Sequence, residues 1–397
     1  MIHFDAIVIG AGPAGATAAL LLARAGWDVA VVERQAFPRG KVCGEYLSVT
    51  NWPLFERAGI ADTLRQHAGP PVREVALIAD GAHIVKALPQ VRSLHVLAGC
   101  AIPREHLDTL LLHAAREAGA NIWQPCKAVD LVSTPHGFQV KAVAGNDNTS
   151  LQLHAPVVIA AHGSWQPGGL PTQPSHAPPR AGDLFGFKTY FQGAALPPAR
   201  MPLICFADGY GGMVHCQGER VSFSGCVRWQ RLRELQQENS EAAGDAVLAH
   251  VLKTCPPLRE VIDPVHATDR WRSSGPLQPG IRRAYQKGVF VAGNAAGEAH
   301  PVVAEGISMA MQAAELLVEE LTPQRGKLHQ LEVRDAIGAS YQRRWRKAFT
   351  TRIRAAATIA HWAMRPTAVR ATLPLLKVMP AALSWGARLS GKVKLVH

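Results

Sequence analysis

Three glycines and one acidic residue near the N-terminus have the types and spacing that dinucleotide binding requires. Gly10, Gly12 and Gly15 form a Gly-x-Gly-x-x-Gly motif, and Glu33 follows Gly15 by eighteen positions. Gly10 permits a tight turn, Gly12 lets a pyrophosphate approach the backbone, and Gly15 lets the next helix lie close to the preceding strand. A carboxylate at Glu33 can accept hydrogen bonds from a ribose diol, which disfavours a phosphorylated ribose. The motif therefore predicts an adenine dinucleotide, either FAD or NAD.

The elements that must position these residues form one βαβ unit. Residues 4–9 are an apolar run typical of a buried parallel strand, and residues 13–24 have helical apolar spacing. Gly26 ends this helix, and residues 27–32 predict a second strand. The free N–H groups at the start of the helix then face the phosphates. The strand before the glycines and the acid after the next strand make a purely structural turn the weaker interpretation.

A second glycine turn occurs almost three hundred residues later in the chain. Residues 288–297 predict a buried strand that runs into a glycine-rich turn, and Gly306 begins a long apolar helix. Strand, turn and helix N-terminus again form a site for an anion or a dipole. Two such sites this far apart imply one cofactor bound by a discontinuous domain.

Two further segments carry charges that suit a cofactor phosphate. The loop from Arg39 to Glu45 combines glycines with mixed charges, which fits either a surface turn or a loop beside the cofactor. Arg104 lies in the first turn of a predicted helix, where a cation is unfavourable for the helix dipole. We interpret Arg104 as the partner of an anion, with a solvated arginine as the alternative.

Short β-runs separated by turn residues predict a broad antiparallel sheet between the two glycine turns. A hairpin is indicated at residues 74–87 and further runs at 185–229. Apolar side chains of this sheet are candidates for a substrate pocket, although each also fits an ordinary core. The pocket candidates are Phe187, Tyr190, Phe206, Met213 and Phe223, with His300 added from the second glycine turn.

The composition indicates a large folded chain with an uneven charge distribution. The chain has 397 residues, of which 48% are hydrophobic, and a net charge of +12. Its seven cysteines are scattered without a C-x-x-C pair, so neither a zinc site nor a disulfide framework is expected, and no metal ligands are grouped. No apolar stretch is long enough to cross a bilayer and no signal peptide precedes the first strand, so we expect a cytoplasmic protein.

The basic C-terminal region, residues 326–397, allows two interpretations. From residue 336 onward it contains twelve Lys or Arg residues and no Asp or Glu. Basic amphipathic helices suit an anionic membrane surface, with peripheral association, or an acidic carrier protein. They equally suit helices packed on the cofactor domain with a solvated basic face. Nucleic acid is not an expected partner, because no recognised reading module accompanies the charge.

These segments resemble the FAD-dependent hydroxylase superfamily built on the p-hydroxybenzoate hydroxylase fold, and most of all its geranylgeranyl reductase branch. The resemblance covers about residues 4–325 and implies an α/β (α+β) fold. It implies a Rossmann-like FAD-binding domain, an inserted antiparallel β-sheet substrate domain and C-terminal helices. The corresponding residues are 1–70, 98–170 and 275–325 for the discontinuous FAD-binding domain, and 71–97 and 171–274 for the substrate domain.

The resemblance also implies FAD as the cofactor and assigns roles along it. The first glycine motif would hold the pyrophosphate, Glu33 the adenosine ribose, and Arg104 the phosphates. The loop around Lys41 would lie along the flavin, and Glu305-Gly306-Ile307 would flank its ring. The expected cofactor-binding residues are Gly10, Gly12, Pro13, Ala14, Gly15, Glu33, Arg34, Lys41, Val42, Cys43, Arg104, Val129, Gly293, Asn294, Glu305, Gly306 and Ile307.

Two positions depart from the family's pattern. Its usual Asp-Gly at a strand end is His162-Gly163 here, and its usual Gly-Asp at the ribityl site is Gly293-Asn294. An amide can still accept a hydrogen bond from a ribityl hydroxyl without carrying charge, so FAD binding remains expected. The change at His162 bears on how the flavin is reduced. The Trp-x-Trp-x-Ile-Pro motif of tryptophan halogenases is absent.

The expected reaction is FAD-dependent monooxygenation of a hydrophobic aromatic, polyketide-like or lipid substrate, with molecular oxygen and with NAD(P)H as electron donor. It would be a hydroxylation or epoxidation through a flavin C4a-hydroperoxide, for which the protein orients the substrate and excludes water. His300, Glu305 and Cys43 are the catalytic candidates, although His300 equally fits a structural histidine. The alternatives are a flavin-dependent reductase of isoprenoid double bonds and a non-catalytic flavin-binding redox module.

Overall fold

The βαβ unit at the N-terminus is the centre of a six-stranded sheet with strand order β19-β20-β12-β2-β3-β8. The computed structural model describes residues 2–88, 98–145, 148–164, 166–175, 177–238, 242–263 and 267–379. All neighbouring strands of this sheet are parallel except β19 and β20. Strands β2, β3 and β12 are buried along their whole length, because helices or strands cover both faces, and this explains their uninterrupted apolar sequences. The bounds are β2 (Ala6–Ile9), β3 (Val29–Val32), β8 (Asn121–Trp123), β12 (Val157–Ala160), β19 (Tyr285–Gln286) and β20 (Val289–Val291).

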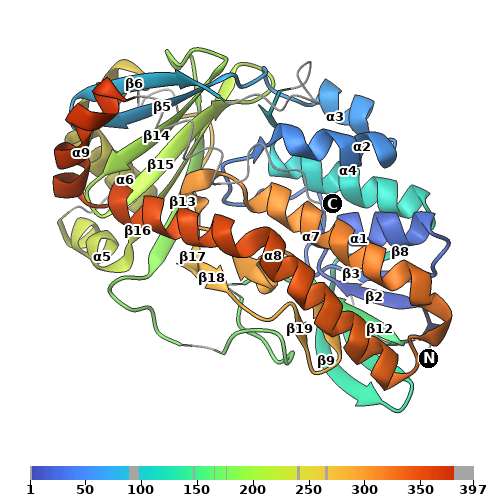
Figure 1. The fold of residues 1–397 in the computed structure, drawn as a ribbon. Helices are drawn as coiled ribbons and strands as arrows, with labels where there is room; N and C mark the ends of the chain where they lie inside the picture. The colour runs from blue at the N-terminus through green and yellow to red at the C-terminus, as the bar shows by residue number, and fades with distance from the viewer. Residues whose placement is uncertain are drawn as a thin grey trace.

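Helices cover one face of this sheet, and a smaller sheet contacts it as well (Figure 1). Helix α1 packs against α4 and α7, and α7 in turn packs against α8. The four-stranded sheet β1-β11-β10-β9 contacts β2, β3 and β12. The helix bounds are α1 (Pro13–Arg24), α4 (Arg104–Glu117), α7 (Gly306–Leu321) and α8 (Leu331–Ala363). The strand bounds are β1 (Ile2–His3), β9 (Cys126–Thr134), β10 (Gly137–Ala144) and β11 (Ser150–Ala155).

A second, seven-stranded sheet has the order β17-β13-β16-β15-β14-β5-β6 and is antiparallel except for the β14–β5 pair. Successive side chains of a strand point to opposite faces, so each strand contributes to two different environments. One face forms a core with the helices α5 (Trp229–Glu238) and α6 (Ala243–Thr254). The strand bounds are β5 (Glu74–Ala79), β6 (Ala82–Ala87), β13 (Leu184–Gln192), β14 (Arg200–Phe206), β15 (Gly209–His215), β16 (Arg220–Arg228) and β17 (Arg272–Leu277).

The C-terminal helices connect the two parts of the molecule. Helix α8 buries Tyr341, Trp345 and Phe349 in the core of the six-stranded layer. Helix α9 (Pro366–Val378) contacts β14 and β6 of the seven-stranded sheet (Figure 1). The expected mixed α/β architecture is therefore confirmed. The remaining short elements are β4 (Tyr46–Leu47), β7 (Cys100–Ala101), β18 (Gly280–Ile281), β21 (Gly297–Glu298), α2 (Trp52–Arg57) and α3 (Ala61–Gln66).

Candidate functional site

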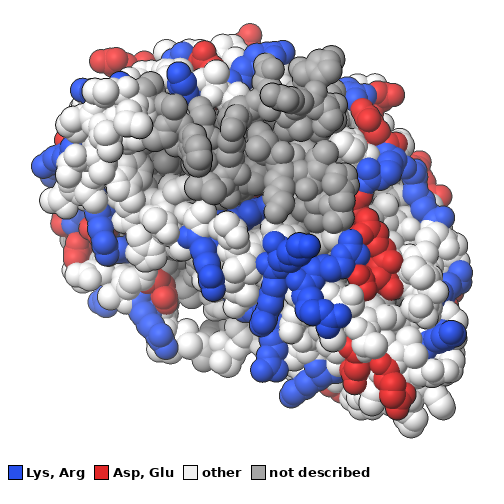
Figure 2. All heavy atoms as spheres, in the orientation of Figure 1, with Lys and Arg blue, Asp and Glu red and all other residues white. Residues whose placement is uncertain are grey.

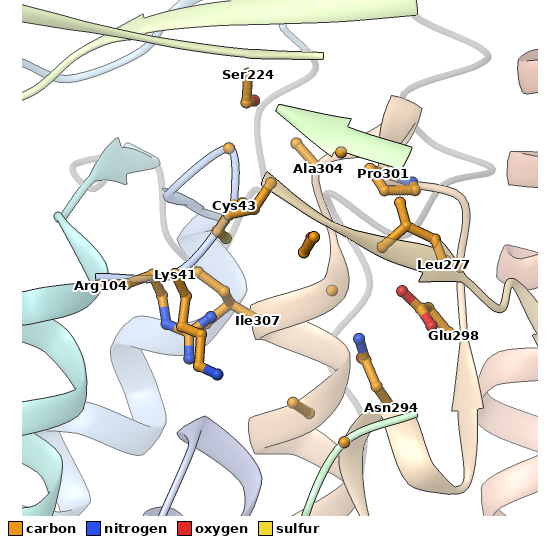
Figure 3. Close-up of a pocket in the computed structure, with 18 of the residues that line it drawn as sticks. Lys41, Cys43, Arg104, Ser224, Leu277, Asn294, Glu298, Pro301, Ala304 and Ile307 are labelled. Carbon is orange, nitrogen blue, oxygen red and sulfur yellow. The ribbon is translucent and has the colours of Figure 1, made fainter. Parts of the chain in front are cut away.

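A cavity of about 690 Å³ runs from the first glycine turn to the seven-stranded sheet. Its walls come from the start of α1, the loop of residues 39–46, the turn after β20, the start of α7 and the inner face of the sheet. Figure 3 shows Lys41 and Arg104 at one end of this space and Ser224 of β16 at the other. The segments that the sequence singled out, although far apart in the chain, thus meet around one cavity.

The first glycine turn has the geometry that its sequence predicts. Gly10 has φ +100°, and a Cβ on Gly15 would lie only 1.8 Å from the Gly10 carbonyl oxygen. A Cβ on Gly12 would meet no atom closer than 3.9 Å, which leaves open space over its backbone. Glu33 is buried and accepts hydrogen bonds from the N–H groups of Ala11 (2.8 Å) and Gln35 (2.9 Å). The turn is therefore held firmly while the space above Gly12 stays available for a phosphate.

Basic side chains gather next to this turn. Arg34, Arg39, Lys41 and Arg104 all line the cavity. Arg104 donates to both carboxylate oxygens of Asp108, at 2.7 and 2.6 Å, because the two residues are one helical turn apart on α4. This pairing raises the pKa of Arg104 despite its burial. Such a concentration of cations fits a pyrophosphate group.

Lys41 gives this basic end a pH dependence. Burial, and after it the charges of Arg39 and Arg34, lower the pKa of Lys41 to about 8. A bound phosphate favours the protonated amine, so binding raises this pKa and becomes weaker as the pH rises through 8. We expect FAD to bind the apoprotein more weakly at pH 9 than at pH 7 in a fluorescence titration. Lys41→Met should bind more weakly at pH 7 and lose most of this pH dependence; an unchanged dependence would contradict the assignment.

The second glycine turn directly contacts the first. Gly293 has φ +64°, and a Cβ there would lie 2.9 Å from the Cβ of Ala14 on α1. Asn294, Gly306 and Ile307 line the cavity beyond this contact, and a Cβ on Gly306 would meet no atom within 4 Å. The N-terminus of α7 therefore opens onto the cavity, where its dipole can stabilise negative charge. The residues present fit an extended dinucleotide that spans both turns.

The seven-stranded sheet corrects part of the expected substrate pocket. Phe187, Phe206 and Phe223 pack in the core against α5 and α6, on the sheet face that points away from the cavity. Met213 borders the cavity, but it pairs with Phe223 and belongs to the same core. The alternation of side chains explains the difference, since on β13 it is Gly186, next to Phe187, that lines the cavity. The β-runs predicted the sheet but not which of its faces lines the cavity.

The apolar walls of the cavity come from other residues. On the sheet they are supplied by strands β5, β14, β15 and β17, and further apolar atoms come from the C-terminal helices, which the sequence did not connect with the pocket. The apolar lining residues include Val75, Leu77, Met201, Leu203, Val214, Leu277, Val302, Ile359, Trp362, Leu375 and Leu376. The large spacing in sequence between these residues left no local signal from which to find them.

Tyr190 belongs to a buried polar cluster instead of an apolar wall. Glu45, Lys188 and Tyr190 are 1%, 2% and 3% exposed. Tyr190 donates its hydroxyl hydrogen to Glu45 (2.8 Å), and Lys188 forms an ion pair with Glu45 and donates to the Tyr190 hydroxyl (2.9 Å). Glu45 also accepts from the backbone N–H of Arg104 (3.0 Å) and lines the cavity. The sequence analysis missed this cluster, although Lys188 within the mostly apolar strand β13 could have indicated a buried charged partner.

The three catalytic candidates lie in different surroundings. Cys43 lines the cavity, whereas His300 and Glu305 are not part of its wall. The His300 ring lies 3.4 Å (Nδ1) from the Tyr210 hydroxyl, and burial, followed by the nearby His361, lowers the pKa of His300 to about 4. Glu305 is 1% exposed, directly before α7. The structure therefore brings only Cys43 of the three to the cavity.

Most of the expected cofactor-binding residues line the cavity, with three exceptions. Gly15 is needed for the packing of α1, as its contact with Gly10 indicates, and does not itself line the space. The side chain of Val129 is 36% exposed and its predecessor Ala128 lines the cavity instead. Glu305 is the third exception. Within the described residues, no three His, Cys, Asp or Glu side chains are placed to hold a metal ion.

Comparisons with known proteins show which family the chain resembles. A family model described as an FAD binding domain matches residues 3–324. Menaquinone reductase of Mycolicibacterium smegmatis is 34% identical over 159 residues, which are 39% of this chain and 37% of that protein. The 6-methylpretetramide 4-monooxygenase of Streptomyces rimosus is 24% identical over 321 residues, 79% of this chain and 73% of that protein. The chain thus spans less than two thirds of the reductase it matches.

A solved structure shares the fold at low sequence identity. The myxobacterial chondrochloren halogenase, described as a variant of FAD-dependent halogenases, superposes with a TM-score of 0.77. It is 19% identical, and the match covers 98% of this chain and 91% of that one. This likeness concerns the arrangement of both sheets and the helices around them.

Proposed function

The chain belongs to the FAD binding domain family, and from this premise we propose that it is an FAD-dependent monooxygenase acting on a hydrophobic small molecule with NAD(P)H as electron donor. One observation carries the proposal: the groove between the two glycine turns continues into an apolar chamber without an intervening wall. Bound FAD would supply the redox chemistry and the activation of oxygen. The protein would bind the cofactor and the substrate, orient the substrate, and exclude water from the reacting groups.

The residues of the cavity divide this work by position. Arg39, Lys41 and Arg104 would hold the phosphates, and the N–H groups at the start of α7 would face negative charge on the ring. The apolar side chains of β5, β14 and β17 would bind the substrate by removing its apolar surface from water. The same side chains keep the reacting end of the cavity dry.

The test is oxygen uptake with a panel of lipophilic phenols and quinones. We expect the yellow holoprotein to consume oxygen with NADPH, faster when a substrate is present, and to place an ¹⁸O atom from ¹⁸O₂ in the product. Substrate-independent oxygen consumption that yields only hydrogen peroxide, for every compound tested, would contradict the proposal.

A flavin-dependent reductase of isoprenoid double bonds is the second candidate. The similarity to a menaquinone reductase supports it, as does the extension of the apolar chamber to α8 and α9, which gives room for a long chain. Loss of a substrate double bond under anaerobic conditions would favour this reaction. A non-catalytic flavin module would show no response of flavin turnover to any substrate.

The basic C-terminal helices suggest a partner for a lipophilic substrate. Arg343, Arg346, Lys347 and Arg354 are exposed on α8, and Figure 2 shows basic side chains grouped along the course of this helix. At the end of α9, three apolar residues are exposed beside Lys377: Leu375, Val378 and Met379. This mixture favours an anionic lipid surface over an acidic carrier protein. No helix of the described residues is long and apolar enough to cross a membrane.

Charge removal tests the lipid surface without disturbing the core. Because α8 also buries Tyr341, Trp345 and Phe349, deleting it would expose the core, so surface substitutions are needed. We expect replacement of Arg343, Arg346 and Lys347 by Gln to weaken sedimentation with phosphatidylserine vesicles by about 100-fold, at about 1 kcal/mol per charge. The matched control replaces three exposed basic residues outside α8, namely Arg116, Lys141 and Lys253, by Gln, and so removes the same charge elsewhere. Two results would overturn the proposal. One is that the control variant loses as much vesicle sedimentation as the α8 variant; the other is that the original protein binds an acidic carrier protein but not the vesicles.

A further inference from the structure

Glu298 directs a buried carboxylate into the cavity. It lies on β21, which pairs with β18 through Gly280 and Glu298. The preceding Gly297 backs onto α8 so closely that a Cβ there would be 2.3 Å from the Trp345 ring. Since adjacent side chains of a strand point in opposite directions, Glu298 faces away from α8, and it is 6% exposed on the cavity wall.

The surrounding groups fix this carboxylate next to the second glycine turn. Ser164 donates its hydroxyl hydrogen to Glu298 Oε2 (2.5 Å), and Arg282 Nη2 lies 4.0 Å from the same oxygen. Arg282 also donates to the carbonyl oxygens of Ala295 (3.2 Å) and Asn294, and so braces the turn itself. Figure 3 shows the Glu298 carboxylate and the Asn294 amide on the same side of the cavity. The two side chains therefore share one environment.

At two positions where the family resemblance leads us to expect an aspartate, this chain has a residue that is not an acid. His162 and Asn294 stand where the resembled family has aspartate. Both line the cavity. His162 lies 2.8 Å (Nε2) from the Thr172 hydroxyl, and burial lowers the pKa of His162 to about 4, so it is neutral at pH 7. Neither position can place a negative charge beside the cofactor.

The other two carboxylates on the cavity wall are already committed. Among the described lining residues these are Glu33, which accepts two backbone N–H groups of the first turn, and Glu45, which is paired with Lys188. Glu298 accepts from the Ser164 hydroxyl and from the Gln278 backbone N–H, and its arginine is farther away than that of Glu33: Arg282 Nη2 lies 4.0 Å from Glu298, whereas Arg39 Nη2 lies 3.4 Å from Glu33. Burial of its carboxyl raises its pKa, as expected for an acid with incomplete charge compensation.

We propose that Glu298 is the carboxylate of the flavin end of the groove and takes over the negative charge that positions 162 and 294 lack. It would accept a hydrogen bond from a cofactor hydroxyl, and its charge would disfavour the anionic reduced ring, which lowers the midpoint potential of the flavin. The proposal rests on FAD binding but not on the reaction proposed above. Its measurements need neither substrate nor turnover, so they stand or fall separately from the oxygenation test.

The experiment exchanges the charge between the two neighbouring positions. Glu298→Gln should bind FAD about tenfold or more weakly in a fluorescence titration of the apoprotein and should have a more positive midpoint potential. Glu298→Gln combined with Asn294→Asp restores an acid on the same turn, so both quantities should return toward the original values. Glu117→Gln, an exposed position at the end of α4, removes the same charge far from the cavity and should change neither.

Two outcomes would overturn the proposal. One is an FAD affinity and a midpoint potential of Glu298→Gln equal to those of the original protein. The other is a double variant no closer to the original protein than Glu298→Gln alone, which would give Glu298 a structural role only. If Glu298→Gln fails to fold, Asn294→Asp in the otherwise original chain decides: two adjacent carboxylates should make the potential more negative, and an unchanged potential would refute the role of charge.

Discussion

Lys188→Met will lower the free energy of unfolding by about 3–5 kcal/mol, as expected when one partner of a buried ion pair is removed. Lys188 is 2% exposed and its partner Glu45 is 1% exposed, so the remaining carboxylate would be left buried without its charged partner. Tyr190 and the backbone N–H of Arg104 still donate to Glu45, but both are neutral donors. Urea denaturation of the holoprotein at pH 7, followed by circular dichroism, measures the loss.

The double variant Glu45→Gln/Lys188→Met separates charge from packing. It is neutral at the cluster, so we expect it to be more stable than Lys188→Met alone. Two results would contradict this assignment: a loss below about 1 kcal/mol for Lys188→Met, or a double variant that is no more stable than the single one. Because Glu45 holds the end of the loop that lines the cavity, Lys188→Met should also weaken FAD binding.

Gly15→Ala will reduce FAD affinity at least about 100-fold, equivalent to about 2.7 kcal/mol. A Cβ at this position would lie 1.8 Å from the carbonyl oxygen of Gly10. That oxygen belongs to the turn itself and cannot move aside, so α1 must shift away from β2 and its N-terminal N–H groups leave the site. Overpacking of this kind also costs about 1–3 kcal/mol of stability.

Gly12→Ala is the matched control for this effect. Its Cβ would have 3.9 Å to the nearest atom, an arginine nitrogen, and its backbone is already in a region that alanine adopts, with φ −68°. We expect a protein with the original melting temperature that nevertheless binds FAD weakly, because the methyl group occupies the space over the turn. If Gly15→Ala bound FAD as the original protein does, the packing role of this glycine would be wrong.

The contrast between β2 and β13 explains which parts of the site were predictable. The turn after β2 joins neighbours in sequence, and its glycines and acid are constrained by local geometry, so spacing alone located them. On β13 the sequence LFGFKTYFQ predicts a strand but does not say which of its two faces points to the cavity. The aromatic residues were assigned to the cavity, whereas Gly186 lines it and Phe187 enters the core behind the sheet. A shift of one residue exchanges the faces, and only the packing of α5 and α6 decides between them.

The sequence by itself determined the βαβ unit and the two glycine turns, because each depends on short-range periodicity or on backbone freedom at glycine. The α/β class came from the family resemblance, and the role of Arg104 as a cofactor-side cation stays a prediction. The tertiary structure alone decided that Gly293 meets Ala14, that Lys188 reaches Glu45 and that Arg282 lies between Glu298 and the Asn294 carbonyl oxygen. It also decided that α8 and α9 line the chamber. The physical reason is that the environment of a side chain depends on the residues that pack against it. In these pairs the packing partners are between twelve and about three hundred positions apart in the chain.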